Sequence, residues 1–539
     1  MAVPPNQRSP RPAASRHPWL LDTLLGLLVV CALPLAITSI PNTLSVVAKL
    51  LPGGFDQVAL MRTHGLALPA LMLTVPFAGV ALRRVPAAHL VLAGLALVAV
   101  SEAAGGYAAS ELLVGVVRVL RGVGAGLLVP ATLAAVWERA PALRALWAGT
   151  FSLSLLAAQA LALWPLDEAG SWKVTLQPYP LVTGVALGLA AFFLLAWTLL
   201  GRPATPVPQP RERGRLLLVA GLAAGIAVVA ISTASAGWRA LPVMMLAVTA
   251  VAGLLALASV GAPESRRAAY TLVAVGVVLL PSAAQVTLVE MGGLGGPGLR
   301  GLWVPYGAAG LLAIAAAVVV RLSAVAAGRW LAPLGLLAMV VGLCSVRLVV
   351  PSADGLVLAV PFTLLTVGAA VAVTATLQEV GIGTAAFGLS LCAAGTLAGF
   401  LLGTGVQMSM LDGVRSAQEL VDKFVGALHW WALIGGFLMV TVIVLAAVLA
   451  RRSEGGAPAS GDVPLAAAPP DGADAVRGSE VRDCSGRPIG ADGRKWGDGP
   501  GAGLPVPAGR ASGEPGAGEE GEAPAVPPQA QSPEDGGTP

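Results

Sequence analysis

The chain has 539 residues, of which 56% are hydrophobic and only 12% are charged, and its mean hydropathy is +0.79. Soluble domains carry about 25% charged residues, so this composition excludes an ordinary soluble protein and indicates an integral membrane protein. The 33 basic and 29 acidic residues nearly cancel and form no basic block, which argues against nucleic acid as a partner.

Apolar runs of about 20 residues, the length that crosses the hydrocarbon core of a bilayer, recur along the chain. Residues 1–18 are polar and rich in Pro and Arg, and the apolar run after them is too long for the core of a signal peptide. We therefore interpret that run as the first of fourteen membrane helices. The predicted helices cover residues 19–40, 60–82, 87–105, 109–133, 142–165, 178–201, 215–235, 240–260, 269–290, 303–325, 329–350, 353–376, 383–404 and 427–450.

Lys and Arg gather in alternate loops of this topology, starting with the N-terminal tail. Because cytoplasmic loops carry an excess of these residues, both termini are predicted to be cytoplasmic and the number of spans to be even. We expect a multi-pass protein of the plasma membrane, with the lipid bilayer as its surroundings and a monomer as its oligomeric state.

Two polar segments divide the chain into parts. A Pro-rich linker follows the sixth predicted helix, and a Gly/Ala/Pro-rich stretch follows the last one, too poor in large apolar residues to fold. Residues 405–426 are predicted to form a long outer loop with a short helix near Ser416–Val425. The expected architecture is an all-α polytopic bundle: an N-terminal cytoplasmic tail (1–18), a six-helix half (19–201), the linker (202–214), an inserted helix pair (215–260), a second six-helix half (269–450) and a disordered cytoplasmic tail (451–539).

Arg118 is a charge well inside the fourth predicted helix. It lies seven residues after Glu111, which corresponds to about 10 Å along a helix. A charge at such a depth costs at least about 2.5 kcal/mol on insertion scales, so intramembrane ionisable groups are functional candidates by default. We therefore take Arg118 as the first candidate for a transport or coupling role.

Other ionisable and polar residues are weaker candidates. Glu290 and His64 are the best proton carriers, because both would face a central cavity if the bundle closes over them, and Arg62 opens the second helix from outside. Gln159 and Trp164 are candidates for lining a pathway. For a polar side chain at a helix end, contact with interfacial water is the more common role.

Small residues at four-residue spacing mark two helices. Gly122 and Gly126 share one face of the fourth helix, and Gly395, Gly399 and Gly403 share one face of the thirteenth. Such spacing lets helix backbones approach closely in lipid. Two roles stay open for these glycine faces: static packing of the helices, or a surface on which the helices rock against each other.

No pattern in the chain points to enzyme chemistry. It contains no phosphate-binding loop, no nucleophile–base pair and no zinc spacing, and its four cysteines are scattered. We therefore predict no catalytic residue, no metal and no cofactor.

Several of these segments resemble the major facilitator superfamily. Arg118-x-x-Arg121-Gly122-x-Gly124-x-Gly126 is similar to the helix-4 pattern of that family. Ser171-Trp172-Lys173 through Pro180 resembles the junction between helices 5 and 6 in its fourteen-helix drug:proton antiporter branch, and Leu364–Gly403 resembles that branch's helix 12–13 region. The resemblance implies two six-helix halves with a substrate site between them near the bilayer midplane.

The chain also departs from the family pattern. In the loop between helices 2 and 3, Arg83 and Arg84 stand where the family has a gating aspartate and its arginine. Gln159-Ala160 replaces the Gly-Pro of the antiporter pattern, and Ala32 falls near the position of a helix-1 carboxylate. These departures weaken the expectation of proton coupling.

The resemblance implies a secondary transporter that exports an apolar or cationic small molecule, a drug or metabolite, by proton antiport. Arg118 would then order the contact between the first and fourth helices and favour the ionised form of a nearby acid. Two alternatives stay open: a membrane binding or assembly protein that has lost transport, and an uncoupled uniporter of a solute.

Overall fold

The computed structural model describes residues 18–51, 56–137, 139–167, 170–200, 212–233, 237–262, 265–291, 296–323 and 328–455. Throughout these ranges the secondary structure is helical, and fourteen helices are long and apolar enough to cross a membrane. The predicted fold class is therefore confirmed. The N-terminal tail, most of the linker at 202–214 and nearly all of the C-terminal tail lie outside the described residues.

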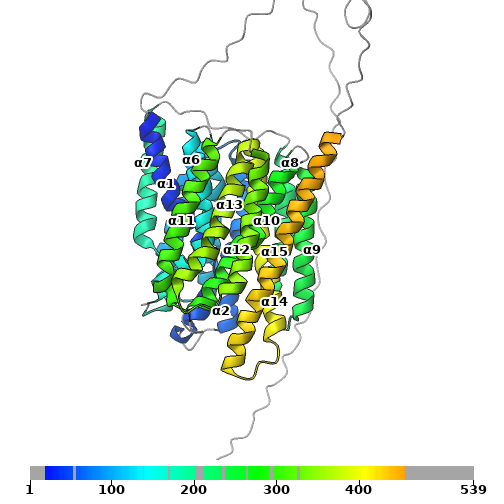
Figure 1. The fold of residues 1–539 in the computed structure, drawn as a ribbon. Helices are drawn as coiled ribbons and strands as arrows, with labels where there is room; N and C mark the ends of the chain where they lie inside the picture. Colours follow the sequence, from blue (N-terminus) through cyan, green and yellow to red (C-terminus); the bar gives the residue numbers. More distant parts are fainter. Residues whose placement is uncertain are drawn as a thin grey trace, which may run out of the picture. The chain divides into compact units, whose positions relative to one another are not determined.

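The helices stand side by side in a bundle (Figure 1). They all belong to one compact unit, Met1–Ser460. Their bounds are α1 Pro18–Thr38, α2 Gln57–His64, α3 Ala67–Ala81, α4 Ala87–Gly105, α5 Glu111–Trp137, α6 Pro141–Leu163, α7 Pro180–Leu199, α8 Glu212–Thr233, α9 Ala240–Gly261, α10 Arg266–Glu290, α11 Gly298–Leu322, α12 Gly328–Val349, α13 Ala359–Glu379, α14 Ile382–Leu411 and α15 Ala417–Gly455, with short 3-10 turns at Leu44–Leu50, Trp164–Leu166, Trp172–Thr175 and Gly355–Leu358.

The second span is not one continuous helix. The short helix α2 ends at His64 and α3 begins at Ala67, while Asp56 caps the start of α2 through its side chain. Backbone carbonyls at the end of a helix lack partners within that helix. The break therefore leaves the His64 carbonyl available to another group inside the bundle.

The predicted long loop over 405–426 is wrong, although the short helix predicted within it near Ser416–Val425 falls on helical residues, the first turns of α15. Helix α14 continues to Leu411 and α15 begins at Ala417, so that only a short turn joins them. Gly413 lies in this turn with φ +74°, a conformation that suits glycine. The Ser416 hydroxyl accepts a hydrogen bond from the Glu419 backbone N–H, which starts α15 ten residues earlier than predicted.

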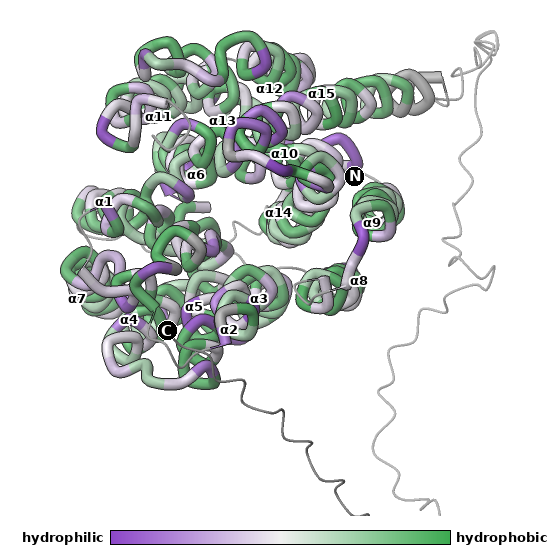
Figure 2. The backbone as a smooth tube through the Cα atoms, turned by 90° about the horizontal axis from the view of Figure 1, so that it is seen from below, coloured by the Kyte–Doolittle hydropathy of each residue, from purple (hydrophilic) through white to green (hydrophobic). Residues whose placement is uncertain are grey.

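Helices α6 and α14 connect the first six spans with the last six. Helix α6 packs on α1 and also on α10, α11 and α13, whereas α14 packs on α10 and also on α3. Seen from below, the inserted pair α8 and α9 lies at one side of the bundle, with α8 beside α3 and α9 near α14 (Figure 2). In the most apolar part of each span, 89% of the residues are buried in α10 and α14 and 83% in α6, compared with 28% in α9, so α6, α10 and α14 form the centre of the bundle.

The predicted glycine faces lie at close contacts between neighbouring helices. A Cβ atom on Gly122 or Gly126 would meet backbone carbonyls of α3, and one on Gly395 or Gly399 would meet backbone carbonyls of α10. A Cβ on Gly403 would overlap the Gln285 amide of α10. Each contact lies within one set of six spans. The glycines thus pack α5 on α3 and α14 on α10.

We expect Gly399→Ala to destabilise the bundle by roughly 1–3 kcal/mol, the usual cost of overpacking. The new methyl group would overlap the Val277 carbonyl oxygen, which cannot move away as a flexible side chain would. The matched control is Gly221→Ala on α8, where a Cβ meets no atom within 4 Å. Unfolding of both purified variants in a denaturing-detergent titration measures the difference, and equal midpoints would contradict the packing role of Gly399.

Candidate functional site

A cavity of about 320 Å³ lies between the first six and the last six spans. It sits toward the face at which α1 ends and α2 begins, which the charge pattern predicts to be the outer one. The inserted helix α8 contributes to its wall. Its lining residues are Ile40, Pro41, Asn42, Met61, Arg62, Gly65, Leu68, Pro69, Gln159, Ala230, Ile231, Ala284, Gln285, Leu288, Leu397, Phe400, Thr404 and Gln407.

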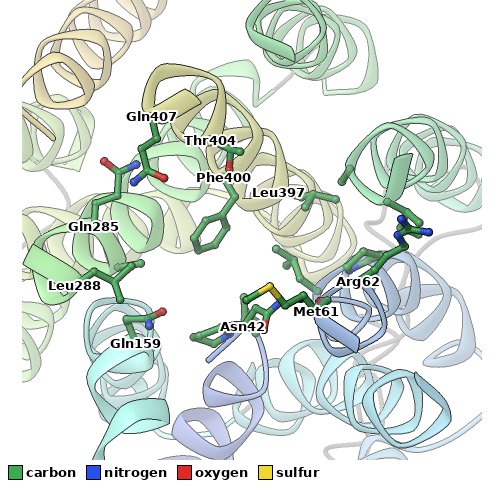
Figure 3. A pocket seen from close by; sticks show the side chains of 18 residues that line it. Asn42, Met61, Arg62, Gln159, Gln285, Leu288, Leu397, Phe400, Thr404 and Gln407 are labelled. Carbon is green, nitrogen blue, oxygen red and sulfur yellow. Dashed lines mark hydrogen bonds between the residues drawn. The ribbon is translucent and has the colours of Figure 1, made fainter. Parts of the chain in front are cut away.

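The polar side chains of the cavity are not spread evenly (Figure 3). Gln285 and Gln407 lie close together on one side, with Gln159 below them on the same side. Arg62 lies at the opposite edge, and apolar side chains such as Leu397 stand between the two polar ends. The cavity therefore has a neutral, amide-rich end and a positively charged end.

Arg62 is the one ionisable side chain among these lining residues, which include no Asp, Glu or His. Its buried Nε atom has no hydrogen-bond partner among the described residues, and neither has the buried Oε1 of Gln285. A buried polar atom without a partner costs about 1–3 kcal/mol, and such atoms are uncommon in folded proteins. These two atoms are available to a bound molecule.

Toward the predicted cytoplasmic side the cavity narrows. A separate void of about 20 Å³ lies beside it, shares Ile40 and Leu68 with its lining and is lined almost wholly by apolar side chains. Still further along, α3 meets its neighbours closely: a Cβ on Gly79 would lie 3.2 Å from a Leu216 methyl group and 3.5 Å from the Ala386 Cβ. The cavity is thus separated from that side by packed helices.

Arg118 is buried and binds backbone carbonyls. Its Nε donates to the His64 carbonyl (2.7 Å), and one terminal nitrogen donates to the carbonyls of Ser39 (2.9 Å) and Pro41 (3.1 Å). These acceptors lie at the ends of α1 and α2, where carbonyls lack helical partners and the helix dipole favours a cation. Within the described part of the chain Arg118 forms no ion pair.

The resemblance implied that Arg118 orders the contact between α1 and α5. The hydrogen bonds from Arg118 to Ser39 and Pro41 join α5 to the segment that follows α1. The resemblance also implied an acid beside Arg118. Among the described residues no acidic side chain accepts a hydrogen bond from Arg118, since all its acceptors are main-chain oxygens. The Arg118 contacts hold Pro41 and the end of α2, both of which border the cavity.

Sequence reasoning missed a buried ion pair next to Arg118. Arg121 donates to Glu102 at 3.0 Å and to the Leu176 carbonyl at 3.2 Å, and both charged side chains are almost fully buried. From its place near the end of the third predicted helix, Glu102 reads as an interfacial residue. The available signal was Arg121 itself, because a membrane-embedded charge usually has a partner of opposite sign.

Neither proposed proton carrier lines the cavity. His64 is fully buried and neither of its ring nitrogens has a partner among the described residues. Glu290 is also fully buried, at the end of α10, where its Oε1 accepts a hydrogen bond from the Ser352 backbone N–H. Both groups are separated from the polar lining residues in this conformation.

The remaining candidates divide into two groups. Gln159 and Arg62 line the cavity, as a pathway role requires. Trp164 does not: it is partly exposed at the end of α6 and contacts Trp303 edge-on, with ring centroids 3.9 Å apart. Arg83 and Arg84 lie in the α3–α4 turn at the other end of the bundle, where Arg84 is exposed.

Comparison with solved structures gives the fold. The structure of the major facilitator superfamily proton:xylose symporter XylE bound to 6-bromo-6-deoxy-D-glucose matches with a TM-score of 0.50 and 13% identity, covering 80% of this chain and 95% of the symporter. A partially occluded inward-open structure of the xylose transporter XylE from E. coli matches with a TM-score of 0.47 and 12% identity, covering 78% and 98%. No protein-family model and no curated sequence matches the chain.

The chain is thus a multi-pass helical membrane protein. The described residues contain fourteen spans, and their fold is similar to that of the proton:xylose symporter.

Proposed function

We propose that this protein is a secondary transporter of a small organic molecule, which binds in the cavity between the first six and the last six spans. The observation that carries the proposal is the lining itself: polar side chains from α6, α10 and α14 converge there, and two of the lining residues hold buried polar atoms without partners. Rocking of the two sets of six spans would open this site to each side of the membrane in turn.

Export of a drug or metabolite against a proton is the form of transport that the resemblance to drug:proton antiporters implies. In that form Glu290 or His64 would carry the proton, and a change of conformation would have to bring one of them to the cavity. We propose the plasma membrane as its location and a monomer as its oligomeric state, and the charge pattern supports both termini in the cytoplasm.

Uniport without protons is a second candidate function. It is favoured by the lining of the cavity, in which none of the described residues is an acid or a histidine. A binding or assembly protein without transport is less well supported, because it gives no reason for a cavity between the two sets of spans with unpartnered polar atoms.

Counterflow in liposomes that contain the purified full chain tests the proposal. The probes are ethidium as an apolar cation, xylose as a neutral polar molecule and octanoate as an organic anion. We expect flux of at least one probe. For ethidium or xylose, which carry hydrogen-bond donors, we expect Gln285→Leu and Gln407→Leu each to lower it by roughly tenfold through the loss of a hydrogen bond to the ligand. Gln418→Leu, on the exposed start of α15, should leave the flux unchanged.

The two forms of transport separate in the same liposomes. Proton antiport predicts that flux alkalinises or acidifies the lumen and that a protonophore changes its rate, whereas uniport predicts neither. Flux that is equal in Gln285→Leu, Gln407→Leu and Gln418→Leu would place the pathway outside this cavity, and no flux of any probe would count against transport.

A further inference from the structure

The charge of the cavity indicates what kind of molecule it accepts. Arg62 brings a positive charge to the lining, and the other lining side chains bring no negative one. Arg62 forms none of the ion pairs found among the described residues. Opposite charges attract strongly where water is partly excluded, so such a cavity favours an anion and disfavours a cation.

Arg62 is held in place by the local structure. Asp56 caps α2, and the Asn42 side-chain amide at the end of α1 donates to the Met61 carbonyl at 2.9 Å. The Gly65 backbone N–H, in turn, donates to the Arg62 carbonyl. The guanidinium is therefore carried by a short helix that is fixed at both ends.

The other end of the cavity offers hydrogen bonds without charge. Gln285 is 8% exposed, and its buried Oε1 is an acceptor without a partner. Gln407 and Gln285 lie next to each other across the cavity from Arg62 (Figure 3). A ligand donor, such as a hydroxyl group, would satisfy the Gln285 oxygen.

The wall between these ends is mostly apolar and also includes Asn42 and Thr404. Leu397 and Phe400 of α14 and Leu68 of α3 line it, and Ala230 and Ile231 of the inserted helix α8 complete it. Ile231 is 37% exposed and Val228, one turn earlier and absent from the lining, is 68% exposed. The end of α8 therefore lines the cavity in addition to packing against the outside of the bundle.

We propose that the cavity binds an organic anion with an apolar middle, whose acidic group faces Arg62 and whose far end carries a hydrogen-bond donor that faces Gln285, and that α8 forms part of this binding site. The proposal rests on the proposed function and names its substrate class. It differs from the apolar or cationic molecule that the sequence resemblance implies.

Binding of a matched set of eight-carbon probes to the full chain in lipid nanodiscs tests it: octanoate, 8-hydroxyoctanoate and octylammonium. Wild-type protein should bind 8-hydroxyoctanoate most tightly and octylammonium most weakly. Arg62→Gln should weaken binding of both carboxylates by roughly tenfold, the size expected for one charge-assisted hydrogen bond. The control is Arg239→Gln, an exposed arginine before α9 that does not line the cavity.

Two further variants test the other parts of the site. Gln285→Leu should remove the advantage of 8-hydroxyoctanoate over octanoate, and Gln407→Leu replaces it if that variant does not fold. Ile231→Trp should block binding of all three probes by filling the α8 side of the cavity, whereas Val228→Trp, at an exposed position that is absent from the lining, should not.

Octylammonium binding as tightly as octanoate, or octanoate binding that is equal in Arg62→Gln and Arg239→Gln, would overturn the anion assignment. If the carboxylates fail to bind while ethidium or xylose flux depends on Gln285, the substrate class is wrong and the transport function stands. If Ile231→Trp and Val228→Trp behave alike, α8 has no part in the site.

Discussion

Replacing Arg118 by alanine is expected to destabilise the folded protein by at least about 3 kcal/mol. Three carbonyl oxygens, of Ser39, Pro41 and His64, lose their donor in this variant. Each buried acceptor left without a partner costs about 1–3 kcal/mol, and water has little access to a side chain that is 2% exposed. The unfolding midpoint of the purified variant in a denaturing-detergent titration measures the loss.

A destabilised Arg118→Ala should also lose transport, since its bonds hold the end of α1 and the break after α2 at the edge of the cavity. The control is Arg239→Ala, which removes an exposed arginine. A variant with wild-type stability and no flux would show that Arg118 acts on the substrate or on a proton, and would contradict a structural role for Arg118.

Removing one member of the Arg121–Glu102 pair should cost roughly 3–5 kcal/mol, because the remaining charge stays buried without its partner. The Arg121 and Glu102 side chains are 1% and 3% exposed, so solvent cannot replace the lost partner. Arg121→Met and Glu102→Met should each unfold much more readily than the wild type. The double variant should regain most of the lost stability, because two well-packed apolar side chains can replace a buried ion pair at little cost.

The partly exposed pair between Asp22 and Arg139 provides the comparison. Its atoms are 3.4 Å apart and its side chains are 28% and 13% exposed. Asp22→Asn should therefore cost about 1 kcal/mol or less, as is usual for ion pairs that solvent reaches. The measurement is the unfolding midpoint of Arg121→Met, Glu102→Met, their double variant and Asp22→Asn. If the two single variants of the buried pair are as stable as Asp22→Asn, the Arg121–Glu102 pair is not a main support of the fold.

The number and order of the spans could be predicted from sequence because a bilayer leaves a chain few choices. Backbone groups in lipid must bond within the same segment, so each long apolar run becomes a helix. The same reasoning fails outside the hydrocarbon core. Residues 405–411 and 417–426 extend two helices beyond the apolar runs, since polar side chains in water do not prevent a helix from continuing.

The site was harder to predict, because the sequence shows how deep in the membrane a residue lies better than it shows the direction in which its side chain points from the helix. One position along a helix turns the side chain by about 100°, so neighbours point to different surroundings. Arg62 lines the cavity, while His64, two residues later, is enclosed by protein. Gln285 lines it as well, yet Glu290 at the end of the same helix does not.

The partners of Arg118 have no signature in a sequence. A carbonyl oxygen is present at every position, and only the break between α2 and α3 and the end of α1 make three of them available at one place. Gln285 gave a signal that was within reach, because an amide inside an apolar helix is costly to bury and calls for a partner. Gln407 gave none, because it fell in the predicted loop over 405–426.

Helix α8 touches α3 from the first six spans and α14 from the last six, while α9 touches α14 and α10. The pair is therefore anchored to the last six spans by two helices and to the first six by one. If the two sets of spans rock as we propose, we expect α8 and α9 to move with α14 and the contact between Gly79 and Leu216 to slide.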